Sequence, residues 1–310
     1  MLIVVTGATG YIGRLLLARL VESGHRVRCI IRPSETSPRL PRDIPLQIAV
    51  TNLGDFRSIR AALVGAEQVI HLASAENSGS AEKMLQVDVD GTRRLLSAAQ
   101  EVGVRRLLYL SHLGADAKSY FPLFQRKGQA EQLIQQSGVP FTIIRSALAF
   151  GAEDRFTNTL AAIAALSPGT FFLPGDGQIR LQPVWVEDLT ACIEYTLEDT
   201  TLLNQTVSIG GPEYLSVQHI CQLVMEQSGR VLRPTELAIP YLRWLTRRHH
   251  RRFPNAPVHS MFLDHFTVNR TCEIHNITRF FGVRATRMEH ALQYLRPLKP
   301  RDARRWVRGK

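Results

Sequence analysis

The sequence predicts an α/β protein built on a doubly wound parallel sheet, with a smaller, mainly helical C-terminal lobe. Three observations in its 310 residues support this prediction: a glycine-rich turn after the first apolar run, alternation of short apolar runs with helical patterns, and a change of pattern beyond Phe150-Gly151. The alternation favours a parallel sheet, because each step to a parallel neighbour needs a long connection that returns along the sheet.

The glycine-rich turn is the best-defined motif of the chain. The apolar run Leu2–Thr6 is followed by glycines at 7, 10 and 13 and then by a helical pattern. In a Rossmann dinucleotide site these glycines allow a tight turn, close approach of the backbone to a pyrophosphate, and close packing of helix on strand. The start of the helix then faces the phosphates. A glycine turn without a ligand is the alternative. The motif predicts cofactor contacts from Gly7, Thr9, Gly10, Tyr11, Ile12, Gly13 and Arg14.

The end of the second expected strand, Arg26–Ile31, indicates which dinucleotide is bound. A site that prefers NAD usually carries an acidic residue about 20 residues after the glycines, where it binds the ribose 2′-hydroxyl. Here that position is Arg32, and Arg14 stands directly behind Gly13. Arginine attracts a 2′-phosphate that a carboxylate would repel, so we expect NADP(H) rather than NAD(H). The alternative is that Arg32 only covers the rim of the sheet.

Two later strand ends supply further cofactor candidates. After the strand Leu46–Val50 come Asn52 and Leu53, where the Asn52 amide could touch the adenine edge or simply form a turn. The strand at 68–73 ends in the small residues Ala73-Ser74, where a nucleotide ribose would pass. We expect His71, within that strand, to be a packed core residue, and we expect no metal site.

The chain is predicted to fold into two lobes. Residues 1–155, joined by 184–212, are expected to form the NAD(P)-binding domain, and 156–183 with 213–310 to form the smaller lobe that covers the cofactor cleft. The remaining expected elements are an irregular proline-rich connection at 33–45, a helix capped by Asp55, helices at about 80–102 and 123–137, strands at 105–111 and 139–145, and an edge strand near 206–211.

The net charge of +11 is unevenly distributed. One basic cluster is Arg247–Arg252, and a second is the tail from Arg296 to Lys310. Such clusters attract acidic protein faces or anionic membrane surfaces, although a merely solvated surface is the simpler interpretation. Nucleic acid is not an expected partner, because no reader motif accompanies the charge.

Cysteines and hydropathy indicate the compartment. The four cysteines show no paired spacing, which favours a reducing environment over a disulfide framework. No apolar run approaches the ~20 residues of a membrane span, and the chain begins directly with a strand rather than a signal peptide. We therefore expect a cytoplasmic protein that can also associate peripherally with a membrane.

Several motifs stand in a recognisable order along the chain: Thr6–Gly13, Val69–Ala73, Gly91-Thr92, Tyr109–Ser111, Ser111–Ala115, Lys127–Glu131 and Pro183–Leu189. Together they resemble the short-chain dehydrogenase/reductase superfamily, in particular its extended, epimerase-like branch. More narrowly, the chain is similar to atypical members such as NmrA-like regulators and the NADPH-holding accessory subunit of respiratory complex I. The resemblance implies a Rossmann fold and a nicotinamide cofactor.

The resemblance also implies a catalytic pattern, which this chain only partly matches. In active members a tyrosine transfers the proton, a lysine four residues later lowers its pKa, and a serine holds the substrate oxygen. Ser111 and Lys127 match, but the tyrosine position is Leu123, which has no proton to transfer. Tyr120 could reach the site from its loop, or Lys127 or a water could do the acid–base work. Alternatively, Lys127 only binds the ribose and nicotinamide end, and Ser111 only caps the strand.

Two functions therefore stay open from the sequence. The first is an atypical reductase that uses NADPH to reduce or epimerise a small carbonyl substrate. The second is a non-catalytic protein that holds NADP(H) as a structural ligand or redox signal, since a bound nucleotide stabilises a fold through linkage alone. In the second case the basic clusters would dock an acidic partner or a membrane surface, as in an assembly or accessory factor.

Overall fold

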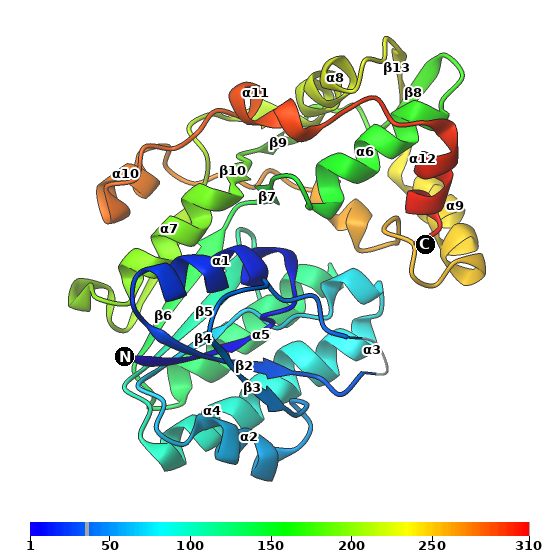
Figure 1. The fold of residues 1–310 in the computed structure, drawn as a ribbon. Coiled ribbons are helices and arrows are strands. Elements are labelled where there is room, and N and C mark those ends of the chain that lie inside the picture. The colour runs from blue at the N-terminus through cyan, green and yellow to red at the C-terminus, as the bar shows by residue number, and fades with distance from the viewer. Residues whose placement is uncertain (35–36, 310) are drawn as a thin grey trace.

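The computed structural model describes residues 1–34 and 37–309. Seven parallel strands form the central sheet in the order β11-β6-β5-β4-β1-β2-β3 (Figure 1). This confirms the predicted doubly wound α/β fold. Residues 35–36 of the expected irregular connection and Lys310 of the basic tail lie outside the described residues. The strands of the sheet are β1 (Leu2–Thr6), β2 (Arg26–Ile31), β3 (Leu46–Val50), β4 (Gln68–His71), β5 (Arg106–His112), β6 (Phe141–Ser146) and β11 (Gln205–Ile209).

The strand order places a topological switch point beside the glycine turn. From β1 the chain moves outward to β2 and β3, then crosses back to β4 on the other side of β1. Because the connections on the two sides of β1 leave in opposite directions, a crevice forms at the carboxyl ends of β1 and β4, where ligands of open α/β sheets bind. The glycine turn that follows Thr6 lies at this crevice.

Helices cover both faces of the sheet (Figure 1). One apolar core lies under α1 and α7 and takes in Ile277 and Phe281 of α10, while a second lies under α2, α4 and α5. The carboxylate of Asp55 caps α2 as predicted, accepting hydrogen bonds from two backbone N–H groups. The bounds are α1 (Tyr11–Glu22), α2 (Phe56–Leu63), α4 (Thr92–Val102), α5 (Pro122–Gln136), α7 (Val186–Thr196) and α10 (Asn276–Phe281).

The helix expected at 80–102 is present, but its middle is not a regular α-helix. It begins as α3 (Ala81–Met84), continues as a π-helix over Leu85–Gly91, and becomes regular only in α4. Each π-turn holds an extra residue, so the side chains after it rotate relative to a regular helix, and such segments often occur at functional sites. The segment contains Asp88, which is completely buried. A 3-10 turn, Glu76–Ser78, precedes α3.

A second lobe is assembled around its own apolar core, from residues on both sides of β11. It contains three two-stranded sheets as well as helices, and the C-terminal region is helical, as predicted. The division into lobes at the predicted boundaries remains a prediction. The elements are β7 (Ala149–Phe150) with β10 (Val184–Trp185), β9 (Arg180–Leu181) with β12 (Leu215–Ser216), β8 (Thr170–Pro174) with β13 (Arg233–Leu237), helices α6 (Arg155–Leu166), α8 (Val217–Gln227), α9 (Ile239–Arg252), α11 (Met288–Ala291) and α12 (Pro300–Val307), and 3-10 turns at Phe262–Phe266 and Leu292–Tyr294. A further 3-10 turn, Thr200–Leu202, packs against the sheet core under α1 and α7.

Candidate functional site

The glycine turn is packed so tightly that side chains are excluded from it. Gly7 has φ of +73°, and a Cβ there would lie 2.6 Å from the backbone nitrogen of Ala73. A Cβ on Gly13 would collide with the carbonyl oxygen of Gly7, so α1 can approach the turn only because residue 13 is glycine. Gly10 caps α1 without a side-chain hydrogen bond, and the first turn holds no acidic residue. The exposed start of α1 is therefore a cradle that fits a pyrophosphate.

Beneath this turn His71 is held in a chain of hydrogen bonds. Thr6 Oγ1 lies 2.6 Å from His71 Nδ1, and His71 Nε2 lies 2.8 Å from Thr92 Oγ1. The Thr92 hydroxyl donates its one proton to the carbonyl of Asp88, so it accepts from Nε2–H. Burial lowers the pKa of His71 to about 3, so the ring is neutral and its Nδ1 accepts from the Thr6 hydroxyl, which also accepts from the Ala73 N–H.

Lys127, predicted as the ribose-binding or catalytic lysine, lies in a buried cluster. Its Nζ is 3.2 Å from Asp88 Oδ1 and 5.4 Å from the ring centroid of Tyr109. The other Asp88 oxygen accepts a hydrogen bond of 2.8 Å from the Ala75 backbone N–H. Burial alone would lower the pKa of Lys127, but Tyr109 and the carboxylates of Asp88 and Glu76 reverse that effect and raise it. Lys127 is thus held as a cation, suited to binding rather than to releasing a proton.

The other two catalytic candidates are placed differently. The Ser111 hydroxyl donates to the buried carboxylate of Glu131, which is also bonded by the Arg145 guanidinium at 3.0 Å. Its proton is therefore engaged away from any substrate. Tyr120 is 98% exposed, and Leu123 is buried in the apolar cluster at the start of α5. Ser111, Tyr120 and Leu123 therefore do not supply a proton donor beside Lys127.

The remaining cofactor candidates lie around the crevice. Arg32 is exposed directly after β2, the strand that pairs with β1 up to Thr6. Arg14 donates to the Thr9 carbonyl at 2.7 Å and pairs with Glu153, which lies between β7 and α6, so its charge is already partly balanced.

The strand-end candidates adopt local turns. The Asn52 side chain accepts from the Gly54 N–H at 2.7 Å, which is the turn-forming alternative noted above, and Leu53 is half-buried. Ala73 and Ser74 are half-buried at the carboxyl end of β4, where the Ser74 hydroxyl accepts from the backbone N–H of Glu76 at 3.2 Å.

Sequence reasoning missed Asp88, Glu76 and Glu131, the carboxylates that organise the site. Asp88 stands between Val87 and Val89, and its burial depends on the π-helix, which has no pattern that can be read from the sequence. Burial raises the pKa of Glu76.

A second buried cluster lies where the lobes meet at the end of β5. The rings of His112 and His265 are 5.5 Å apart, and Arg270 bonds His265 Nδ1 at 2.9 Å while lying over the Phe124 ring. Burial and the Arg270 charge lower the pKa of both histidines well below the usual value, and burial lowers the pKa of Arg270 to about 9. The cluster therefore places polar groups where the lobes meet, but neither histidine is an acid with a pKa near neutral pH.

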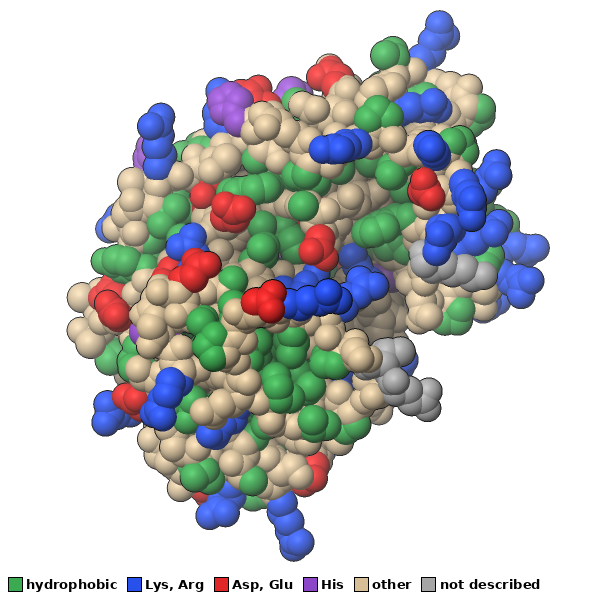
Figure 2. Space-filling model, viewed as in Figure 1, with side chains coloured by type: hydrophobic (Ala, Val, Ile, Leu, Met, Phe, Trp, Pro, Cys, Tyr) green, Lys and Arg blue, Asp and Glu red, His purple; other side chains and the backbone are tan. Residues whose placement is uncertain are grey.

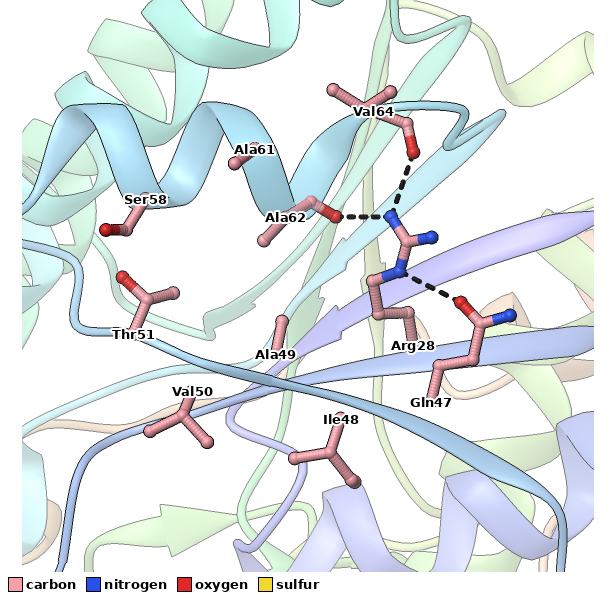
Figure 3. Close-up of a pocket in the computed structure, with 10 residues that line it drawn as sticks. All are labelled: Arg28, Gln47, Ile48, Ala49, Val50, Thr51, Ser58, Ala61, Ala62 and Val64. Atoms are coloured by element: carbon pink, nitrogen blue, oxygen red, sulfur yellow. Dashed lines mark hydrogen bonds between the residues drawn. The ribbon is translucent and has the colours of Figure 1, made fainter.

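A shallow hollow also lies against edge strand β3, away from these clusters (Figure 3). Arg28 reaches across it to the carbonyls of Ala62 and Val64 at 2.8 Å, and so satisfies the carboxyl end of α2. The apolar side chains of Ile48 and Val50 project beside it, 46% and 61% exposed. Because Arg28 is engaged by the protein's own backbone, the hollow offers little directed chemistry.

The His71 chain predicts a pH dependence of stability. The unfolded histidine binds a proton below pH 6.5, whereas folded His71 resists it down to about 3, so stability falls as pH drops through that window. Between pH 7 and 5 His71 contributes about 2 kcal/mol to this loss. In His71→Asn, the difference in unfolding free energy between the two pH values, measured by urea denaturation, should shrink by that amount. The exposed His219→Asn variant is the control; an unchanged difference in His71→Asn would contradict the neutral assignment.

Comparison with known proteins places this geometry among nicotinamide-binding proteins. Residues 7–158 match the NAD(P)H-binding family model. The chain is 29% identical over 245 residues to the mitochondrial NADH dehydrogenase [ubiquinone] 1 alpha subcomplex subunit 9 of Arabidopsis thaliana, covering 76% of this chain and 60% of that protein. It is 31% identical over 190 residues to the ceramide reductase of Caulobacter vibrioides, covering 61% of this chain and 58% of that protein. The chain thus spans about three fifths of the length of these relatives.

Solved structures show the same fold at lower identity. The NADPH-dependent quinone oxidoreductase of Escherichia coli, complexed with NADPH, superposes with a TM-score of 0.76 at 18% identity, covering 94% of this chain and 99% of that one. The UDP-glucose 4-epimerase of Thermotoga maritima gives a TM-score of 0.72 at 18% identity, covering 95% and 97%. Among the described residues, no helix is both long and apolar enough to cross a bilayer.

Proposed function

We propose that this chain, in which residues 7–158 match the NAD(P)H-binding family model, is an atypical short-chain dehydrogenase/reductase-like protein that uses NADP(H) to reduce or epimerise a small carbonyl substrate. The cofactor, when bound, supplies or accepts the hydride. The glycine turn would hold its pyrophosphate and Lys127 its ribose and nicotinamide end.

The observation that carries this proposal is the position of Lys127. A lysine on a solvent-facing helix surface would need no partner, whereas this one is 4% exposed and ion-paired to a buried carboxylate. Burying such an ion pair costs free energy, because both charges lose their hydration. This costly pair lies beside the crevice of the glycine turn. A fixed cation with hydrogen-bond donors suits the hydroxyls of a ribose.

The choice of NADP(H) rests on Arg32. It follows the strand next to β1, where a 2′-phosphate would lie, and it is exposed, with no carboxylate paired to it in the described part of the chain. Arg14 would contribute less, because Glu153 already pairs with it. A planar guanidinium binds phosphate through two parallel hydrogen bonds, which supports preference for NADP(H) over NAD(H).

The test is to identify the nucleotide that co-purifies with the protein and to measure its exchange with added NADPH and NADH. We expect NADP(H), exchange within the time of a turnover assay, and oxidation of NADPH by members of a carbonyl panel. In Arg32→Asp the preference should reverse toward NADH. A chain that binds neither nucleotide would refute the proposal, and unchanged discrimination in Arg32→Asp would remove Arg32 from it.

A second candidate function is favoured by the engaged Ser111 and the buried Leu123. With these residues the usual proton-transfer pair is not assembled, which suits a protein that holds NADP(H) as a structural or sensing ligand. Such a protein would dock an acidic partner or an anionic membrane surface through its basic clusters. One relative is named as a subunit of an NADH dehydrogenase, which supports this candidate. Tightly held NADPH that barely exchanges would favour it over the reductase.

A further inference from the structure

The two basic segments, which are far apart in the sequence, lie side by side in the fold. His249 Nε2 bonds to the carbonyl of Val307 at 2.8 Å, and the Arg308 guanidinium lies 5.3 Å from the ring centroid of Phe253. Figure 2 shows Lys and Arg side chains gathered at this end of the molecule. We name it the α9–α12 surface, and its exposed members are Tyr241, Trp244, Leu245, Arg247, Arg248, Arg251, Arg252, Arg301, Arg304, Arg305 and Arg308.

The charge of the α9–α12 surface is not neutralised by the protein. Within the described residues, none of its eight arginines forms an ion pair with a carboxylate. The helices that carry them are nevertheless anchored: Trp306 Nε1 donates to Thr159 Oγ1 at 3.1 Å, and Ala303 is buried against α6. A rigid display of like charges is unfavourable on its own and attracts an anionic partner.

The outward face of α9 adds apolar side chains to this charge. Tyr241, Trp244 and Leu245 are 51%, 54% and 38% exposed, and the first two rings stack with centroids 5.8 Å apart. Together with Arg248 they follow the spacing of a single helix face. The inward face is fixed by Arg243, which bonds Asp264 Oδ1 at 2.7 Å.

We propose that the α9–α12 surface binds anionic lipid bilayers peripherally, with α9 lying in the headgroup region. Tyrosine and tryptophan prefer the membrane interface, where the ring enters an apolar layer and the polar atom stays hydrated, and arginines beside them meet lipid phosphates. An acidic protein or a nucleic acid would also balance the charge, and binding of either one is an outcome that the experiment below distinguishes from lipid binding.

The position of the surface also suits a membrane-facing site. Figure 2 shows the molecule hollowed between the sheet domain and the end that carries the α9–α12 surface. Docking through this surface would bring the hollow close to the bilayer. The proposal rests on the docking role put forward as the second candidate function. NADPH binding is measured in parallel, so that failure of lipid binding is distinguished from failure of the nucleotide site.

The experiment is co-sedimentation of the full chain, loaded with NADPH, with two kinds of vesicle. One kind is phosphatidylcholine alone, and the other contains about 30% phosphatidylglycerol, which gives a strongly anionic surface. We expect binding only to the anionic vesicles, weakening as salt rises. In Arg248→Glu/Arg251→Glu the affinity should fall by about 25-fold or more, because each lost basic residue is worth about fivefold. The matched control is Arg26→Glu/Arg284→Glu, which makes the same charge change elsewhere and should bind like the wild type.

Insertion of α9 has its own readout. Phosphatidylglycerol with brominated acyl chains should quench the tryptophan emission of the wild type, and Trp244→Phe should lose most of the quenching while still sedimenting with vesicles. The proposal is overturned if anionic vesicles do not bind, if the control pair loses as much affinity as the surface pair, or if Trp244 is not quenched. Binding of an RNA oligonucleotide or polyglutamate in place of vesicles would also overturn it.

Discussion

Replacing Lys127 with methionine should lower the free energy of unfolding by about 3–5 kcal/mol and abolish measurable NADPH turnover. The stability loss arises because Asp88, completely buried, keeps a negative charge without its cation. Methionine is chosen because it fills nearly the same space, so that loss of charge rather than a cavity dominates. Urea denaturation measures the first effect, and NADPH binding and oxidation measure the second.

A double-mutant cycle isolates the ion pair. In an Asp88→Asn background, where the amide oxygen can still accept from the Ala75 N–H, Lys127→Met should cost clearly less than in the wild type. The exposed Lys83→Met variant should change neither quantity. If the protein is a sensor rather than an enzyme, Lys127→Met will weaken NADPH binding with no turnover to lose. Unchanged stability and unchanged NADPH affinity in Lys127→Met would contradict the role given to this residue.

Replacing Gly13 with alanine should weaken NADPH binding by about 10- to 100-fold, equivalent to the 1–3 kcal/mol that overpacking usually costs. The added methyl group collides with the carbonyl oxygen of Gly7 and lies 2.8 Å from that of Ala8, so α1 must move away from the turn. The helix start and the turn then no longer face one pyrophosphate together. Isothermal titration with NADPH measures the loss.

Gly24→Ala provides the matched control for that experiment. Gly24 follows α1, has φ of +78° and has open space around its missing side chain. Alanine there costs about 1–2 kcal/mol of backbone strain without touching the turn, so the protein should lose stability but keep its NADPH affinity. Equal losses of affinity in the two variants would mean that binding responds to general destabilisation, not to the geometry of the turn.

The features that the sequence predicts correctly are those decided by local chemistry. The spacing of Gly7, Gly10 and Gly13 after an apolar strand specified the turn, because only glycine tolerates both the left-handed backbone and the close approach of a helix. The strand at 206–211 was correctly expected at the sheet edge, where β11 pairs with β6.

The partners of the site residues could not be read in the same way. Ser111 and Lys127 were recognised, but Glu131 and Asp88, which decide their protonation and direction, lie on other turns and elements. A carboxylate's partner depends on which face its helix presents, and the π-helix at Leu85–Gly91 rotates Asp88 from the position that a regular helix would give it.

By itself the sequence determined the doubly wound sheet, the glycine turn and the presence of two basic segments, because strand patterns, glycine conformations and charge counts are local properties of the chain. Only the tertiary structure decided that Lys127 is a buried, ion-paired cation, that Ser111 is engaged by Glu131, and that α9 and α12 form one surface. These outcomes depend on burial and on contacts between distant segments, and the cost of an unpaired buried charge exists only once the chain has folded around it.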